Sequence, residues 1–395
     1  LFRGPEVILN GTGSSDITVG KKGIGVYAYN TAVNFETNYG VEVKDKGTGI
    51  FIEGNNPSLN SNKNFELKYS GLPTEYAVAL YMNNKSTSST ASMLNKMNIN
   101  INDIVNTVSN TKGLLGILAK GTAGEINNQG NITADAGYGI ISEGVEVRNS
   151  GNITLNNPID DVNKKESVGM YGTGAGTKIY NGTASNPNAV IKLNSSNTTG
   201  IYLDNGAYGY NYGTIKSNGA GLSRIVGVVV KNGSTIENHG HIDINALDAR
   251  GILSKGNLLG TNLGIIKNYG TFNINGVTNV NDSTVTGTDV SDLSKTISGI
   301  KIDVPKGSST GTITVDGNLV IPEIATTSGE EFKPMELSKI GMYIDTSNKV
   351  FTNPIIGLNV LKSLKQADLI MGVEATHQDH LLGCQQLLKI KQMEL

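Results

Sequence analysis

The sequence predicts an all-β chain that folds as a right-handed parallel β-helix, or β-solenoid, of about ten coils with a short C-terminal cap. An unusual composition and two interleaved repeats predict this fold. The 395 residues include 50 Gly, one Cys and no Trp, and only 17% of them are charged. Asn, Gly, Thr and Ser separate short runs of Ile, Val, Leu and Tyr, a pattern typical of short strands joined by turns.

The first repeat reads apolar, any residue, Asn, any residue, Gly, any residue, apolar. Its apolar residues are two or four positions apart, so their side chains lie on one face of an extended strand. The copies are Ile126-Asn128-Gly130-Ile132, Val147-Asn149-Gly151-Ile153, Ile236-Asn238-Gly240-Ile242 and Ile266-Asn268-Gly270-Phe272, with a partial copy at Asn211-Gly213-Ile215.

The second repeat is a Gly followed by alternating apolar residues. Its copies lie mostly 23 to 31 residues apart, with the Asn-Gly motif usually between two of them. One period therefore holds two or three short strands, which is one coil of a parallel β-helix, and stacked coils bury an apolar column that no single repeat could bury. The copies begin at Gly25, Gly49, Gly116, Gly139, Gly169, Gly200, Gly227, Gly251, Gly299 and Gly341, and Ala79 fills the gap after the second.

The Asn and Gly of the first repeat are expected to form a structural ladder at a turn. Gly accepts a positive φ at a tight corner, and Asn tolerates the left-handed region. The Asn amide can also bond to the same amide in the next coil. Adjacent coils are about 4.8 Å apart, so about ten coils form a rod roughly 50 Å long. The expected ladder consists of Asn128, Gly130, Asn149, Gly151, Asn211, Gly213, Asn238, Gly240, Asn268 and Gly270.

Changes in composition suggest boundaries along the chain. Residues 1–320 are expected to form the β-helix, with insertions at 85–112 and 277–295, the first containing a short capped helix over Met93–Met97. Residues 321–376 are expected to form the last coil and the cap, because an open last coil exposes strand edges. Residues 377–395 are rich in Leu, Gln and Lys and look like a frameshifted or truncated tail.

Charge and end sequences exclude several classes of function. The chain has 32 basic and 34 acidic residues, so no basic surface is expected that could follow a nucleic-acid backbone. Cys384 has no second cysteine with which to form a disulfide. The sequence that starts at Leu1 lacks the features of a signal peptide, which favours an internal cut through a longer protein. No apolar stretch is long enough for a transmembrane helix.

Together with the repeats, three C-terminal segments carry a family resemblance over roughly residues 20 to 376. The segments are Ile340-Gly341-Met342-Tyr343-Ile344-Asp345-Thr346-Ser347, Thr352-Asn353-Pro354-Ile355 and Ala367-Asp368-Leu369-Ile370-Met371-Gly372-Val373-Glu374-Ala375-Thr376. In this combination the chain resembles the passenger region of the large fusobacterial type V autotransporter adhesins.

The resemblance implies a secreted β-helix displayed at the cell surface through a C-terminal outer-membrane β-barrel. It also implies attachment to host cells or partner bacteria through a surface protein or glycan. The chain departs from the family pattern because no succession of alternating strands with aromatic girdles follows residue 376. Contact with a membrane is therefore expected only through a barrel that this chain does not contain.

Catalytic, metal and cofactor motifs are weak. Gly307–Gly311 matches a nucleophile elbow, but the residues after it indicate a strand where that motif needs a helix. His239 and His241 could share a strand face, yet no third ligand accompanies them. The glycines of Gly172–Gly176 lack a following helix that could bind phosphate, so a loop is expected. We therefore expect no catalytic residue, metal or cofactor.

Three functions remain open after the motifs. The first is an adhesin stalk or binding face for host cells or partner bacteria, the second a carbohydrate-active β-helix enzyme, and the third a purely structural spacer. Carboxylates clustered on consecutive coils would favour the enzyme, and an exposed row of Tyr and Asn would favour binding. The candidate ligand face, with aromatic packing on or inside the coil as the alternative, is Tyr202, Tyr208, Tyr210 and Tyr212.

Overall fold

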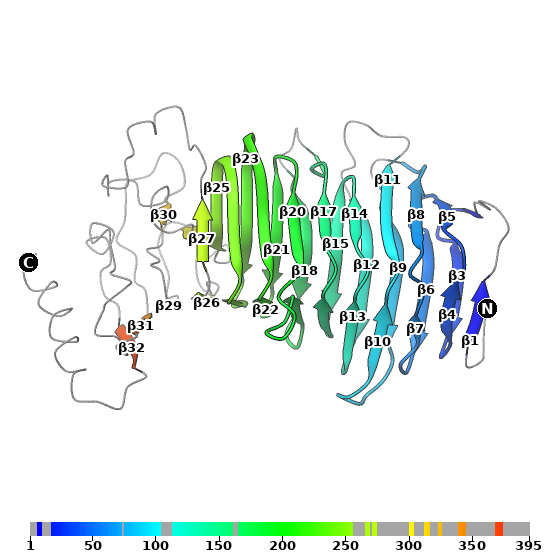
Figure 1. Cartoon of the computed structure of the whole chain (residues 1–395), viewed down its shortest axis with the longest axis horizontal. Coiled ribbons are helices and arrows are strands. Elements are labelled where there is room, and N and C mark those ends of the chain that lie inside the picture. Colours follow the sequence, from blue (N-terminus) through cyan, green and yellow to red (C-terminus); the bar gives the residue numbers. More distant parts are fainter. Residues whose placement is uncertain are drawn as a thin grey trace, which may run out of the picture.

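The computed structural model confirms that the chain is an all-β parallel solenoid. It describes residues 6–9, 17–72, 75–103, 113–160, 165–255, 265–268, 271–274, 300–303, 312–316, 323–325, 339–344 and 368–373. Strands of successive coils stand side by side and form an elongated body (Figure 1). Within these residues every strand of one coil pairs in parallel with the corresponding strand of the next.

One sheet, which we call sheet I, is 13-stranded and takes one strand from each coil. Its strands are β1 (Glu6–Leu9), β4 (Ala32–Phe35), β7 (Ser58–Leu59), β10 (Ser92–Asn95), β13 (Glu125–Asn128), β16 (Glu146–Asn149), β19 (Lys178–Asn181), β22 (Tyr208–Asn211), β24 (Thr235–Asn238), β26 (Ile265–Asn268), β29 (Thr312–Asp316), β31 (Lys339–Ile344) and β32 (Asp368–Val373). The sequence predicts about ten coils because that number counts copies of the Gly repeat. Sheet I has more strands because it also includes coils in which this repeat is imperfect.

Two further columns of strands form sheets II and III. Sheet II contains β2 (Ile17–Val19), β5 (Tyr39–Val43), β8 (Asn64–Tyr69), β11 (Asn98–Asp103), β14 (Ile132–Ala134), β17 (Ile153–Leu155), β20 (Val190–Leu193) and β27 (Thr271–Ile274). Sheet III contains β3 (Ile24–Tyr29), β6 (Thr48–Gly54), β9 (Ala77–Asn84), β12 (Leu114–Gly121), β15 (Gly137–Glu143), β18 (Ser167–Thr173), β21 (Thr198–Asp204), β28 (Ile300–Asp303) and β30 (Glu323–Ala325). The long strands β23 (Thr214–Lys231) and β25 (His241–Lys255) run through both sheets. The right-handed sense of the coil stays a prediction.

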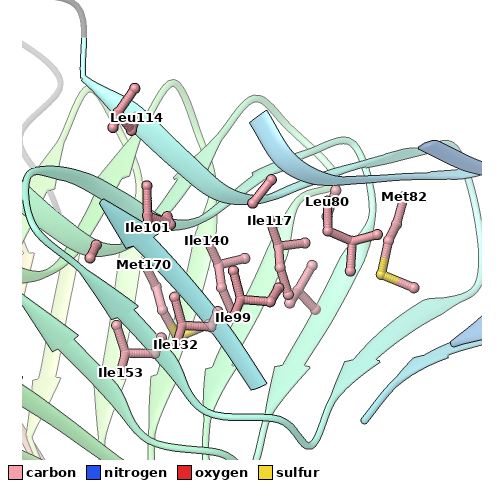
Figure 2. Close-up of a cluster of buried hydrophobic side chains, with 14 of the residues drawn as sticks. Leu80, Met82, Ile99, Ile101, Leu114, Ile117, Ile132, Ile140, Ile153 and Met170 are labelled. Atoms are coloured by element: carbon pink, nitrogen blue, oxygen red, sulfur yellow. The ribbon is translucent and has the colours of Figure 1, made fainter. Parts of the chain in front are cut away.

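Inward side chains from the three sheets fill the interior. The apolar residues of both repeats supply them, because alternate residues of a strand point to the same face. Ile140 and Met170 of sheet III and Ile132 and Ile153 of sheet II are fully buried. Figure 2 shows these residues directed into a common core, where each coil packs on the residues of the next. The core is therefore a continuous column of Ile, Leu, Val and Met, as the repeats predict.

The Asn residues of the first repeat form a buried ladder along the rod. The Nδ2 of Asn128 donates to the Oδ1 of Asn149 over 2.7 Å, and the Nδ2 of Asn211 donates to Asn238 over 2.7 Å. Asn95 and Asn181, which lack the full motif, also belong to the ladder. The strand register continues from Asn238 to Asn268, while Gly270 lies outside the described residues. The amide hydrogen bonds therefore run from Asn95 to Asn238, and they include the predicted Asn128, Asn149, Asn211 and Asn238.

The predicted amide hydrogen bonds of the ladder are present, but the predicted positive φ of its Asn and Gly residues is wrong. None of the Asn or Gly residues of the described ladder has a positive φ. Positive φ occurs instead at other corners, for example at Asn205 and Gly206. The glycines are required because the next coil passes too close: a Cβ on Gly130 or Gly151 would overlap a backbone carbonyl of the neighbouring coil. Close approach of stacked backbones is the physical constraint here.

The part of the predicted insertion at 85–112 that the structure describes, residues 85–103, includes two strands of a regular coil. Residues 92–103 form β10 and β11, which pair in register with the coils on both sides. The predicted helix over Met93–Met97 is wrong, because Met93, Asn95 and Met97 are buried in alternation with half-buried Leu94 and Lys96, which is the pattern of an extended strand. Residues 104–112, the predicted insertion 277–295 and the tail 377–395 lie outside the described residues. Of the predicted cap, 321–376, the structure describes only β30, β31 and β32.

Candidate binding face

The four candidate tyrosines lie on two different sheets. Tyr208 and Tyr210 are in β22 of sheet I, and Tyr212 follows that strand directly. Tyr202 is in β21 of sheet III. A corner containing Asn205 and Gly206, both with positive φ, separates Tyr202 from the other three. The structure therefore divides the expected face into two surfaces.

The outer surface of sheet I carries a set of stacked rings that we call the tyrosine ladder: Tyr180, Tyr208, Tyr210, Tyr212 and His239. The rings of Tyr180 and Tyr210, from adjacent coils, are nearly parallel at a centroid distance of 4.4 Å. Tyr212 and His239 stack in the same way at 4.6 Å. Within one coil, Tyr210 lies 5.6 Å from Tyr208 and 6.5 Å from Tyr212. The ladder thus crosses three coils.

The orientation of the rings determines what the ladder can contact. Adjacent coils are about 4.8 Å apart along the rod. Two rings that stack between neighbouring coils therefore have their planes roughly perpendicular to the rod axis. The faces of Tyr180 and Tyr210 toward each other are therefore occupied, and a partner can reach these half-buried rings only at their free edges. Such a surface combines apolar C–H edges with hydrogen-bonding groups, which suits a protein or glycan contact. The two ring faces of Tyr180 and Tyr210 that stack on each other cannot also stack on a sugar ring.

Arg148 closes one end of the tyrosine ladder. Its guanidinium carbon lies 4.3 Å from the centroid of the Tyr180 ring, a cation–π contact. Glu125 binds the Nε of Arg148 over 3.0 Å, and Glu146 pairs with a terminal nitrogen. Burial acts to lower the pKa of Arg148, but Glu146, Tyr180 and Glu125 outweigh it, and the pKa is raised. The guanidinium is thus held charged against the ring.

The two carboxylates beside Arg148 are a feature that the sequence did not reveal. Glu125 and Glu146 occupy the same position in adjacent coils, because β13 and β16 pair in register. They are 21 residues apart in the chain, so their proximity depends on the coil length. Since both bind Arg148, the cluster as it stands is an ion-pair network that orders the first rung of the ladder.

One histidine contributes to the tyrosine ladder. His239 stacks on Tyr212, and its Nε2 lies 3.5 Å from a carboxylate oxygen of Glu237. His241 lies in β25, exposed at its surface. Over the described part of the chain, no three His, Cys, Asp or Glu side chains gather closely enough to hold a metal ion. Gly174 and Gly176 have positive φ in the turn between β18 and β19, as expected for a loop.

Tyr202 belongs to a second feature, which we call the apolar row, on the outside of sheet III. Phe51 and Tyr81 stack at 4.4 Å, and Tyr171 and Tyr202 lie 5.3 Å apart. All members are half-buried, and register places one in each successive coil. The apolar row consists of Tyr27, Phe51, Tyr81, Leu118, Ile141, Tyr171 and Tyr202.

Sheet II presents a different surface. Its outward positions carry polar and charged side chains, and apolar side chains at alternate positions point inward. A register row across six coils contains no aromatic residue and consists of Glu66, Asn100, Thr133, Thr154, Lys192 and Lys216. In the described coils the aromatic surfaces are thus confined to sheets I and III.

Burial of the outer tyrosines predicts a loss of stability in alkali. Burial raises the pKa of Tyr138 to about 12, and burial followed by nearby carboxylates raises the pKa of Tyr180 and Tyr202 above the ordinary 10.0. The unfolded chain loses these phenolic protons near pH 10, while the folded chain keeps them. The stabilisation is therefore complete below pH 10 and is lost as the pH rises through the folded pKa values.

Absorbance at 295 nm checks this expectation, because the chain has 15 Tyr and no Trp. In a titration from roughly pH 9 to 12, we expect one group of tyrosines to ionise near the ordinary pKa and another only as the circular dichroism signal of β structure disappears. If all tyrosines ionised together near pH 10 with the β signal intact, the buried environment of these rings would be contradicted.

The described residues contain no helix with the length and hydropathy needed to cross a bilayer. Comparison of the chain with protein-family models, with curated proteins and with solved structures gives no match.

Proposed function

We propose that this chain is a non-catalytic, rod-shaped segment of a bacterial surface adhesin of the autotransporter type, and that the tyrosine ladder is its contact surface for host cells or partner bacteria. The observation that carries the proposal is the outward set of stacked rings on a rigid parallel β-helix. Aromatic side chains supply large contact area at low cost in conformational entropy, and tyrosine is enriched where binding energy is concentrated. The family resemblance of the repeats and C-terminal segments supplies the autotransporter part of the proposal.

The geometry of the ladder supports binding in a specific way. The ring stacking and the Arg148 clamp fix the side chains before any partner arrives, so little conformational entropy is lost on binding. The free ring edges then face the partner, which favours a hydrogen-bonded contact with a glycan or a polar protein surface. A β-helix places this contact at a set distance along the rod, as an adhesin requires.

A cell-binding assay tests the proposal. The fluorescently labelled 395-residue chain is titrated onto host cells and onto a panel of partner bacteria, and saturable binding is expected to at least one of them. Tyr210→Thr, at the centre of the ladder, is expected to weaken that binding about tenfold, as for a central hot spot. Tyr76→Thr is the matched control, since Tyr76 is 40% exposed and outside the ladder, and it should leave the affinity unchanged.

The same samples separate the alternatives. Saturable binding that Tyr210→Thr does not change would contradict the ladder as the contact surface. Absence of binding by a chain with full β signal would favour the spacer. Glu125 and Glu146 give the carbohydrate-active enzyme a specific basis, because they lie together on adjacent coils. Release of reducing ends from host glycans that is lost in Glu146→Gln would favour the enzyme over the adhesin.

A further inference from the structure

Two stacked turns between sheets II and III carry a group of lysines. Residues 20–23 join β2 to β3, and residues 44–47 join β5 to β6 in the next coil. Each turn is closed by a hydrogen bond from the N–H of its last residue to the carbonyl oxygen of its first, over 3.0 and 2.9 Å. The turns also bond to each other, since the Lys22 N–H donates to the carbonyl oxygen of Asp45 over 2.9 Å. We call this surface the basic corner, and it consists of Lys21, Lys22, Lys44 and Lys46.

Two of these lysines have a backbone conformation that suits other residues better. Lys22 and Lys46 have φ of 59° and 57°, and they occupy equivalent positions in adjacent coils. In the described part of the chain eight residues other than Gly have a positive φ, and five of them are Asn. The third basic residue of that group, Arg224, uses its side chain to bond to Asn197. Because the left-handed region costs Lys more than Asn or Gly, lysine at both turns points to a use for its charge.

The carboxylates beside the basic corner neutralise only part of its charge. Glu75 pairs with Lys46 over 3.4 Å. The carboxylate of Asp45 accepts the N–H of Leu72 over 2.7 Å, and this hydrogen bond, followed by smaller contributions that include the charge of Lys21, lowers the pKa of Asp45. Three lysines are exposed and form no ion pair with a carboxylate of the residues that the structure describes: Lys21, Lys22 and Lys44.

We propose that the basic corner binds an acidic polysaccharide, whose sulfate or carboxylate groups lie against the stacked lysines. The lysines project from one edge of the rod, in coils about 4.8 Å apart, which suits the charges of a linear polymer better than the plane of a lipid surface. Asp45 and Glu75 would repel an anionic lipid surface, whereas sugar hydroxyl groups can donate to Glu75. Two coils are also too short for a nucleic-acid duplex, which usually engages roughly six to ten phosphate contacts.

The basic corner is separate from the tyrosine ladder, and the proposal does not depend on the adhesin function. The ladder lies on the outer surface of sheet I, and its first ring is in β19. Tyr210→Thr should therefore leave binding of an acidic polysaccharide unchanged. In the cell-binding assay, an excess of free heparin occupies the basic corner, so the binding that remains measures the ladder.

Binding of fluorescein-labelled heparin to the 395-residue chain, followed by fluorescence anisotropy, tests the proposal. Lys22→Asn/Lys46→Asn should weaken binding about tenfold and lower the slope of log affinity against log salt by about one to two, because two cations no longer displace counterions. Since Asn tolerates the left-handed region, this variant should unfold at the same urea concentration as the unchanged chain or at a higher one. Lys21→Gln/Lys44→Gln leaves both left-handed positions unchanged and should weaken binding to a similar extent.

The matched control is Lys192→Asn/Lys216→Asn, which removes two lysines that are also in register in adjacent coils, but on sheet II. Its affinity for heparin should stay within about twofold of that of the unchanged chain, because exposed charges farther away than about 10 Å are largely screened. Binding of heparin alone would identify sulfate as the recognised group, and equal binding of hyaluronan would identify the carboxylate; both results support the proposal.

Three results would overturn the proposal. The first is no binding of either polysaccharide by a chain with full β signal in circular dichroism. The second is an equal loss of heparin binding in the control pair, which would mean that lysines anywhere on the rod suffice. The third is tighter binding of a single-stranded oligonucleotide or of phosphatidylserine vesicles than of heparin, which would assign the basic corner to nucleic acid or to lipid.

Discussion

Replacing Gly200 with alanine is expected to lower the free energy of unfolding by about 3 kcal/mol, because sheet III has no room for a Cβ at this position. The Cβ would lie 2.5 Å from the carbonyl oxygen of Gly227 and 2.6 Å from a methyl group of Ile215. That carbonyl belongs to the next coil, whose distance is fixed by the parallel strand pairing. The strain cannot be relieved by rotating a side chain, so the two coils must separate locally.

Urea unfolding followed by circular dichroism measures this loss. Gly221→Ala is the matched control, since a Cβ there meets nothing within 4 Å, and its change should stay within about 0.5 kcal/mol. Equal stability of Gly200→Ala and the unchanged chain would show that the coils can move apart at little cost. Close approach of the next coil would then not be the reason that position 200 requires glycine.

Asn149→Ala is expected to lower the free energy of unfolding by roughly 3 kcal/mol, because it leaves buried polar groups without partners. Asn149 accepts from Asn128 over 2.7 Å, donates to the carbonyl of Gly151 over 2.8 Å, and donates to Asn181 over 3.4 Å. The side chain is 1% exposed, so water cannot replace these bonds without opening the turn. Both neighbouring rungs are affected by a single substitution.

The control for Asn149→Ala is Asn188→Ala, because Asn188 is exposed and its side-chain amide bonds only to nearby Asn186. Its effect on urea unfolding should be within about 0.5 kcal/mol. If the two alanine variants were equally stable, the hydrogen bonds of the Asn ladder would contribute nothing measurable to the free energy of unfolding. A loss confined to Asn149→Ala would identify the ladder as the element that holds the coils in register.

The fold could be predicted from the sequence because the repeats show two things: their spacing gives the length of a coil, and their alternating apolar residues show which face of each strand is buried. Ile126, Val147 and Ile236 follow from the first repeat as a buried column in sheet I, and they lie in it, together with Ile179 of a coil that lacks the full motif. The region around Met93 could not be assigned, since Met97 stands where the motif requires Gly. Helix propensity then outweighed the alternation of Met93, Asn95 and Met97, although that alternation is the actual signal of the strand.

The candidate site was harder to predict because its contacts join residues of different coils. Arg148 meets Tyr180 only through the register of β16 and β19. Aligning the chain on its ladder asparagines would have revealed this row, since Arg148, Tyr180 and Tyr210 each directly precede one. The separation of Tyr202 from Tyr208 could not be read from their short distance in sequence. The positive φ of Asn205 turns the chain onto another sheet between them.

The hydrogen bonds between coils of sheet I run along the rod, and this has a mechanical consequence. A force applied to the two ends of the rod loads the coil interfaces in series, so the weakest terminal interface opens first while the others remain closed. Successive rungs of the Asn ladder are 21 to 33 residues apart, which is the length of chain that each peeled coil releases. A 21-residue coil alone would add about 70 Å of extended chain. Under tension the molecule would therefore lengthen in steps, one coil at a time, and keep the rest of its surface intact.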